Sequence, residues 1–344
     1  MLKRLLLFAL LPLLAISCCT RENLDDCGRG FRLQFRYTHN NQDADLLLEQ
    51  VQHIRIYLFD QNTSVLTGII SAVAQDITRG YIDIDISEGL YTIIAWGSSS
   101  ANMIQDGYMD AQVTDPATNT YVPVAIGTTT LDDFRMMLAY DPLVGNTLAS
   151  VTPKVADFAD LFYASVTDVS VTGSGRRQVV NLDLIKNTST LKVVVTGLNY
   201  LSSRATAAAL PIEIFSTGAN WLYEYNNQWD VYAPRMLYVP YESSLNANAD
   251  AIEVLIKQQR LNTSQRVIAP VLLYIRNTTG ADLITPMDII AAIQQNPAYQ
   301  TQAAIDREDL FTVTIAIEPG DSVNLTVTVT INGWQLANTE TILV

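Results

Sequence analysis

The dominant pattern along the chain is an alternation of apolar and polar residues with a period of two. In FRLQFRY, every second residue from Phe31 to Tyr37 is apolar. The same alternation occurs in IRIYLFD, YIDIDIS and VNLTVTVTI, which begin at residues 54, 81 and 323. This period places alternate side chains on the same face of a strand. The sequence therefore predicts an all-β, mainly antiparallel protein, in which each sheet has one buried and one solvent-exposed face and the sheets stack as a sandwich.

Helical patterns are sparse. The segment TPMDIIAAIQQNP has Thr285 as a capping residue, Pro286 in the first turn, Asp288 three residues after the cap and Pro297 as a terminator. A second short helix is predicted for LDDFRMML, at Leu131–Leu138. Neither segment carries an obvious functional site, so the predicted protein has few and short helices.

The N-terminus predicts an export signal. Lys3 and Arg4 precede a run of twelve residues, Leu5–Ile16, that is almost entirely apolar. A membrane-spanning helix needs about 20 residues, whereas the apolar part of a secretory signal has about 7–15. We therefore predict that residues 1–17 are a signal peptide.

All three cysteines lie close to this leader. The small residues Ala15 and Ser17 stand before Cys18, an arrangement typical of bacterial lipoproteins, in which the cysteine thiol receives diacylglycerol and fatty acids such as palmitate. Such leaders usually carry Leu where this chain has Ala15. Two or three acyl chains anchor a protein stably in a membrane. Lipidation of Cys18 is the prediction, and the alternatives are an ordinary signal peptide or lipidation of Cys19.

The two other cysteines, Cys19 and Cys27, do not make a disulfide framework for a folded domain. They either pair with each other or remain free.

After removal of residues 1–17, the formal net charge changes from −14 to −16, because Lys3 and Arg4 are lost. Such an acidic protein is repelled by nucleic acid, so no nucleic acid partner is expected.

Motifs for catalysis or cofactor binding are missing. The chain has two histidines, His39 and His53, and no HExxH, GxGxxG or GxSxG motif. We expect no catalytic residues, no metal and no cofactor.

The roughly 327 mature residues exceed the size of about 250–300 at which a single core stops growing, which predicts two domains. The softest boundary lies at Asp183–Leu191, giving domains at 30–184 and 185–344.

Several segments in a fixed order resemble one family. They are the lipoprotein leader followed by LDDC, then FRLQFRY, VQHIRIYLFD, GLYTIIAWG, LFYASVTDVSV, KNTSTLKVVVTGL and VTVTINGW. This set is similar to the FimB/Mfa2-like fimbrial anchor lipoproteins of Bacteroidota, which are associated with fimbrillins. The resemblance spans nearly the whole mature chain.

The resemblance implies two tandem transthyretin-like β-sandwich domains and no enzymatic activity. It implies a lipid-anchored protein of the outer membrane and cell surface that holds a fimbria, or pilus, at its base. Fimbrial stalk or accessory subunits would be the partners, joined by strand exchange. Residues 18–29 would be the tether, with Cys27 as a companion cysteine. The segment from Gln335 to Val344, which includes Ile342, is either the last strand of the body or a donor strand that contacts a partner.

Several acidic residues allow two interpretations. Glu22, Asp25 and Asp26 follow Cys18, which resembles a surface-export signal of Bacteroidota, or they simply solvate the tether. Asp83 and Asp85, with the nearby Glu88, suggest either a calcium site or the exposed face of a strand. Strand alternation favours the exposed face.

An aromatic-rich tract at residues 221–241 indicates either core packing or a platform for a glycan or protein partner. Arg176 and Arg177 suggest a hairpin turn or a processing site, and Arg29 is open to the same question. The alternative function is therefore a surface glycan-binding lipoprotein of a nutrient-uptake system, which requires an exposed aromatic platform.

Overall fold

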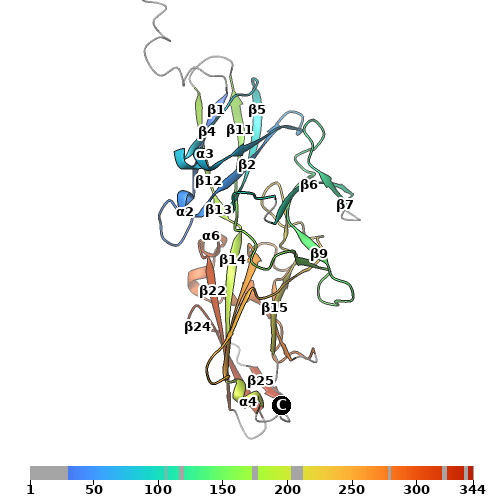
Figure 1. Ribbon diagram of the computed structural model, residues 1–344, viewed down its shortest axis with the longest axis vertical. Coiled ribbons are helices and arrows are strands. Elements are labelled where there is room, and N and C mark those ends of the chain that lie inside the picture. Colours follow the sequence, from blue (N-terminus) through green and yellow to red (C-terminus); the bar gives the residue numbers. More distant parts are fainter. Residues whose placement is uncertain are drawn as a thin grey trace, which may run out of the picture.

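The structure, a computed structural model, describes residues 30–104, 107–115, 120–172, 177–202, 212–277, 280–319, 324–336 and 340–343. It is an elongated protein built mainly from strands (Figure 1). Most strand pairs are antiparallel, and the parallel pairs among the described strands are β1–β12, β10–β17 and β14–β22. The prediction of an all-β, mainly antiparallel fold is confirmed. The leader and tether, residues 1–29, lie outside the described residues.

A sandwich of two sheets forms one end of the molecule. Its smaller sheet has the order β12 (Gln178–Asp183), β1 (Phe31–Arg36) and β4 (Tyr81–Ile84). Its larger sheet has the order β13 (Ile185–Lys186), β11 (Leu161–Val171), β5 (Gly89–Ser98), β2 (His53–Asp60) and β3 (Leu66–Ala72). The alternating apolar residues of FRLQFRY and IRIYLFD meet between these sheets, because both sets belong to one hydrophobic cluster.

The central part of the larger sheet of this sandwich is buried on both faces. Ile54, Ile56 and Leu58 of β2 face the smaller sheet, as the alternation predicts, but Tyr57 and Phe59 between them are also fully buried. They pack into a second hydrophobic cluster, under a sheet with the order β16 (Leu222–Glu224), β8 (Phe134–Leu138), β6 (Tyr108–Asp115) and β7 (Thr120–Pro123). The expectation of one solvent-exposed face is therefore wrong for the centre of this sheet, whereas Ser165, Thr167 and Ser170 of β11 are exposed.

A second sandwich forms the other end of the molecule. One sheet has the order β21 (Met287–Asp288), β20 (Leu272–Asn277), β15 (Ile212–Gly218), β17 (Met236–Tyr238), β10 (Val151–Pro153) and β9 (Tyr140–Pro142). The other has the order β18 (Glu242–Leu245), β19 (Ala251–Gln259), β14 (Thr188–Thr196), β22 (Leu310–Pro319), β23 (Asn324–Ile331) and β24 (Trp334–Gln335). The last strand, β25 (Glu340–Leu343), also pairs with β23.

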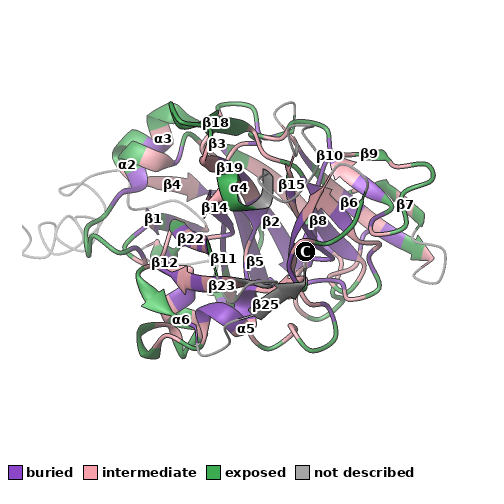
Figure 2. Ribbon diagram, turned by 90° about the horizontal axis from the view of Figure 1, so that it is seen from below, coloured by how far each residue is buried: buried purple, intermediate pink, exposed green. Residues whose placement is uncertain are grey.

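The two ends of the molecule are joined by sheets to which both parts of the chain contribute strands. β16 pairs with β8, and β17 pairs with β10, so strands from residues 222–238 complete sheets begun by residues 108–153. The larger hydrophobic cluster likewise contains Trp96 and Tyr223 side by side. Figure 2 shows buried strands such as β2, β5 and β8 in the interior, with exposed loops and helices around them. The predicted domain boundaries remain a prediction.

The helices are short: α2 (Leu47–Gln50), α3 (Ala74–Arg79), α4 (Leu198–Ser202), α5 (Ile289–Ile293), α6 (Gln302–Asp306) and a 3-10 turn η2 (Pro297–Tyr299). The helix predicted from Thr285 exists only as α5. Its N-cap is Asp288, whose carboxylate accepts a hydrogen bond from the Ala291 N–H at 3.0 Å. It starts late because Met287 and Asp288 first pair with β20 as a strand.

The predicted helix at Leu131–Leu138 is wrong. Phe134–Leu138 form the strand β8, which lies between β6 and β16 and is buried at all five residues. A short continuous apolar run fits a buried strand and a buried helix equally well. Backbone pairing with β6 on one side and β16 on the other makes this segment a strand. No helix among the described residues is long and apolar enough to cross a membrane.

Candidate functional site at the junction of the two halves

We call residues 30–184 the first half and residues 185–344 the second half, and a cluster of largely buried ions joins them. Asp160 precedes β11, and its carboxylate lies 3.0 Å from the ammonium groups of both Lys186 and Lys257. The Thr188 hydroxyl also donates to this carboxylate, at 2.8 Å. Lys186 contacts Asp309 at 3.2 Å as well. One carboxylate of the first half is thus held by β13, β14 and β19.

The charges of this cluster support one another. Burial acts to raise the pKa of Asp160, but the two ammonium groups outweigh it and hold the pKa below its ordinary value. Burial acts to lower the pKa of Lys186, and the carboxylates of Asp160 and Asp309 outweigh it and raise that pKa. Asp160 and Lys186 therefore both stay charged around neutral pH, so Asp160 is a weak base and Lys186 is not a neutral nucleophile.

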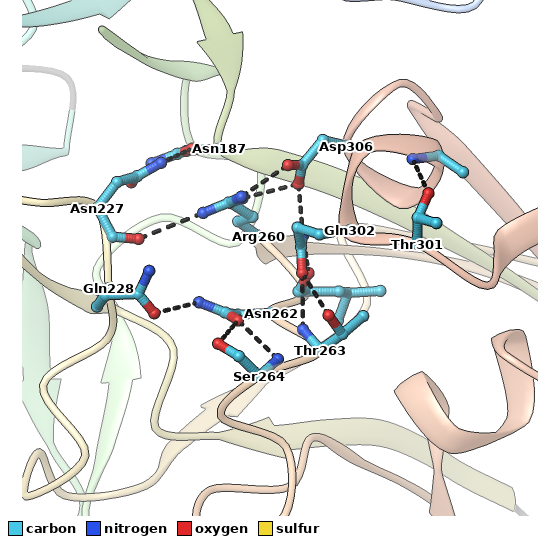
Figure 3. Close-up of polar contacts among 12 residues, drawn as sticks. Asn187, Asn227, Gln228, Arg260, Asn262, Thr263, Ser264, Thr301, Gln302 and Asp306 are labelled. Carbon is cyan, nitrogen blue, oxygen red and sulfur yellow. Dashed lines mark hydrogen bonds and ion pairs between the residues drawn. The ribbon is translucent and has the colours of Figure 1, made fainter. Parts of the chain in front are cut away.

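A second ion pair, between Arg260 and Asp306, is drawn in Figure 3 and lines the same small cavity as Lys186. The guanidinium of Arg260 donates to both carboxylate oxygens of Asp306, at 2.7 and 2.6 Å. Gln302 donates to the same carboxylate at 2.7 Å, and its oxygen accepts from the Thr263 N–H at 2.7 Å. Arg260 reaches the Asn227 carbonyl oxygen at 3.3 Å. We call Asp160, Lys186, Lys257, Arg260 and Asp306 the polar junction.

Amide side chains connect the polar junction to the loops around it. The side chains of Asn187 and Asn227 donate to each other's oxygens, and the Asn262 amide donates to Gln228 at 3.0 Å. The Tyr223 hydroxyl accepts from the Arg260 N–H at 3.1 Å. Such fully satisfied buried networks make a contact specific and rigid. The arrangement is suited to fixing the two halves relative to each other.

A surface contact reinforces the same junction from the outside. Asp43, in the loop after β1, pairs with Arg307, and Asn41 donates to Glu308 at 3.2 Å. Arg307 and Glu308 follow α6, whose last residue is Asp306 of the polar junction. These exposed contacts contribute little energy individually, but they extend the junction across the protein surface.

The aromatic tract at residues 221–241 mostly packs in the core. Trp221, Tyr223, Trp229 and Tyr238 are at most 1% exposed. Tyr232 differs, because it is 77% exposed. The interpretation as core packing is confirmed for these four residues, and they do not form an exposed platform.

A groove of about 540 Å³ opens between the sheets of the second half. Its lining includes Ile212, Ile214, Val239, Pro240, Ile252 and Val254. β17 pairs with β15 only at Ser216–Gly218, and Pro240, which has no N–H, soon follows it. Among the described residues, none pairs with residues 212–215 of β15 on that side.

The structure describes only part of the predicted site residues. Cys18, Cys27, Glu22, Asp25, Asp26 and Val344 lie outside the described residues. Gln335 lies in β24 and is exposed, and Ile342 lies in β25. Both strands pair with β23, so Gln335 and residues 340–343 complete a sheet of the body here.

The acidic residues of YIDIDIS are bound by arginine. Arg32 donates to Asp83 at 2.8 and 3.0 Å, and Arg177 contacts Asp83 at 3.2 Å and Asp85 at 2.6 Å. The hydrogen bonds from Arg32 lower the pKa of Asp83. These cations occupy the carboxylate oxygens that a calcium ion would need, which argues against the metal interpretation. No cluster of metal-ligating residues occurs in the described part of the chain.

Comparison with known proteins identifies the family. The model of the fimbrillin-A associated anchor proteins Mfa1 and Mfa2 matches residues 24–340. The chain belongs to this family. Among curated proteins, none is detectably similar in sequence.

Solved structures share the fold of this anchor-family protein. The fimbrial anchor protein Mfa2 from Porphyromonas gingivalis matches with a TM-score of 0.66 and 18% identity, over 90% of this chain and 99% of that chain. A candidate polysaccharide-binding protein from Bacteroides thetaiotaomicron gives 0.67 and 17%, over 90% and 97%. A candidate adhesin from Bacteroides ovatus gives 0.65 and 18%, over 90% and 95%.

Family membership supports a fimbrial role in the cell envelope and a structural, not enzymatic, class of protein. The polar junction was missed by the sequence reasoning. The segment KNTSTL, which carries the family resemblance, contains Lys186, Asn187 and Thr188. The signal for the polar junction that the sequence offered was a lysine placed between two predicted strands. The sequence around Asp160 contains no such signal, because the partners of Asp160 lie 26 or more residues away in the chain.

Proposed function

We propose that this protein is a lipid-anchored fimbrial anchor of the outer membrane, with Cys18 as the lipid-bearing residue. The family match over residues 24–340 carries the fimbrial part of the proposal, and it begins six residues after Cys18. The acyl chains hold the N-terminus in the membrane, and the folded body presents the opposite end to fimbrial subunits. Glu22, Asp25 and Asp26 act as the signal that exports the protein to the cell surface.

The lipid anchor is tested with adjacent cysteines in the native host. Cys18→Ala is expected to abolish incorporation of a labelled fatty acid and to release the protein from the outer membrane fraction. Cys19→Ala is the matched control, and it retains both the label and the location. A Cys18→Ala protein that is still labelled and still sediments with the outer membrane contradicts the proposal.

We further propose that the terminal segment from Gln335 to Val344 joins the anchor to the next subunit by strand exchange. β25 has one paired neighbour among the described strands, β23, and lies at the edge of its sheet, where backbone groups are available to a partner. The groove beside residues 212–215 combines an unpaired stretch of strand with apolar walls. Both features favour addition of an extended strand.

Deletion of residues 340–344 tests this contact. The truncated anchor is expected to lose co-purification of fimbrial stalk or accessory subunits and to shed fimbriae into the medium. Leu48→Ser, at a 66% exposed position of α2 in the first half, serves as the control and keeps both. Circular dichroism is used to check that the truncated body is folded. Unchanged fimbrial attachment by a folded truncated protein refutes this role.

The glycan-binding alternative is addressed by the same purified protein. Glycan binding would use the exposed aromatic platform that the sequence suggested. That platform is not formed by Trp221, Tyr223, Trp229 and Tyr238, because these side chains are buried. A glycan array is therefore expected to give no specific binding, while a pull-down recovers fimbrial subunits. Glycan binding without subunit recovery would favour the alternative.

A further inference from the structure

The N-terminal strand lies where tension from the membrane enters the fold. β1 begins directly after Gly30 and lies at one end of the long axis, whereas β25 lies at the opposite end (Figure 1). If the protein is a membrane anchor, as proposed above, a pull on the fimbria acts along this axis. The first folded element to bear that pull is β1.

β1 is held on both sides. It pairs in parallel with β12 over six residue pairs, from Phe31–Gln178 to Arg36–Asp183. It pairs antiparallel with β4 over four pairs, from Phe31–Ile84 to Gln34–Tyr81. Its inward side chains, Phe31, Leu33 and Phe35, are at most 2% exposed.

The direction of the strands determines how a pull acts on these pairs. β12 runs in the same direction as β1 and continues through β13 into β14 of the second half. A pull on residue 30 away from the body, opposed by a pull on the second half, therefore slides β1 and β12 along each other. Ladder hydrogen bonds run between strands, across this sliding direction, so they are strained together and not one after another.

Side chains add to this resistance. Arg32 of β1 forms a bidentate contact with Asp83 of β4, and its guanidinium lies 4.0 Å from the centre of the Tyr81 ring. Arg177, just before β12, contacts the same Asp83. One carboxylate thus ties all three strands of the sheet at the end where the tether enters.

The load then passes along a continuous series of paired strands. Residues 178–196 form β12, β13 and β14 in one run, and β14 pairs in parallel with β22 over seven residue pairs. β22 pairs with β23 and β23 with β25, which lies at the far end of the molecule. Tension between the two ends is carried by ladders of hydrogen bonds throughout.

We infer that β1, held between β12 and β4, is a mechanical clamp that resists detachment of the tether by loading its hydrogen bonds in shear. The inference rests on the proposed anchor function for its role in the cell, but the mechanical property belongs to the folded chain alone. Forced unfolding depends on the rate of unfolding along the pulled direction, so the direction of the pull is the deciding variable.

Single-molecule force spectroscopy on the purified, unlipidated chain tests the clamp. Cys18 and Cys19 are replaced by serine, and Cys27 carries one handle. In the shear geometry the second handle is placed at Val267→Cys, which is 84% exposed in the second half. In the control geometry it is placed at Val179→Cys, which is 53% exposed and directly opposite Arg32 in the ladder, so the pull separates β1 from β12 pair by pair.

The first unfolding force in the shear geometry is expected to exceed that in the control geometry by about twofold or more at equal loading rate. Arg32→Ala, in the shear geometry, lowers the force, while Arg36→Ala at the far end of β1 lowers it less. Leu245→Cys, 62% exposed, replaces Val267→Cys if that variant does not fold. Equal forces in the two geometries overturn the clamp, whatever the result of the lipidation experiment.

Discussion

The substitution Asp160→Asn removes the charge at the centre of the polar junction while keeping the shape of the side chain. Lys186 and Lys257, whose side chains are 10% and 14% exposed, would then lack their shared carboxylate. Breaking a buried pair by removing one partner costs about 3–5 kcal/mol. Lys186 keeps Asp309 at 3.2 Å and Lys257 keeps Asp157 at 3.7 Å, so the lower end, about 3 kcal/mol, is expected.

Urea denaturation followed by tryptophan fluorescence measures this loss in the free energy of unfolding, because Trp96, Trp221 and Trp229 are buried. The control is Asp157→Asn, at a side chain that is 63% exposed, with an expected loss below about 1 kcal/mol. A loss for Asp160→Asn no larger than that of Asp157→Asn would show that the junction does not stabilise the fold.

The pH dependence gives an independent check on the same substitution. The pKa of Asp160 is lowered in the folded state, so its contribution is complete above its ordinary pKa of about 3.9 and is lost as the pH falls through the folded-state pKa. The pKa of Lys186 is raised, so its contribution is complete below about 10.4 and is lost as the pH rises through the folded-state pKa. The stability difference between wild type and Asp160→Asn should therefore be full at neutral pH and shrink in strong acid.

Further substitutions test other parts of the structure by the same denaturation assay. Gly197→Ala should lower the free energy of unfolding by more than about 2 kcal/mol, because its Cβ would lie 2.0 Å from the Ile317 carbonyl oxygen. Gly333→Ala, with a similar φ of +77° and no atom within 4 Å of the added Cβ, should cost only the backbone strain of about 1 kcal/mol. Equal costs for the two variants would contradict the clash. Tyr223→Phe should cost about 1–3 kcal/mol, because it removes the buried hydroxyl that donates to the side-chain oxygen of the buried Gln259 at 3.1 Å. Tyr232→Phe, 77% exposed, should be neutral. Arg260→Met should cost about 3–5 kcal/mol, and adding Asp306→Leu should recover most of it; no recovery would show that the pair is not the source of the loss.

Alternation along the chain was sufficient to predict the class of fold. The period-two pattern of FRLQFRY and VTVTI specifies a strand with one apolar face, and Phe31, Leu33, Val327 and Ile331 are buried as expected. A short helix does form in the segment predicted from Thr285, although its cap is Asp288 and not Thr285. These features depend on residues close together in sequence, so local pattern was enough.

Tertiary contacts decided the rest. Phe134–Leu138 fit a helix or a strand, and only pairing with β6 and β16 selects the strand. Tyr57 and Phe59 are buried because a second sheet covers their face of β2, which no local pattern records. The polar junction likewise joins Asp160 to Lys257, 97 residues away, and charged residues so far apart carry no mark in sequence that they will meet. Sequence alone therefore determined the strands with a clear alternation, while the packing of sheets determined the strand at Phe134–Leu138, which faces are buried and which charges are paired.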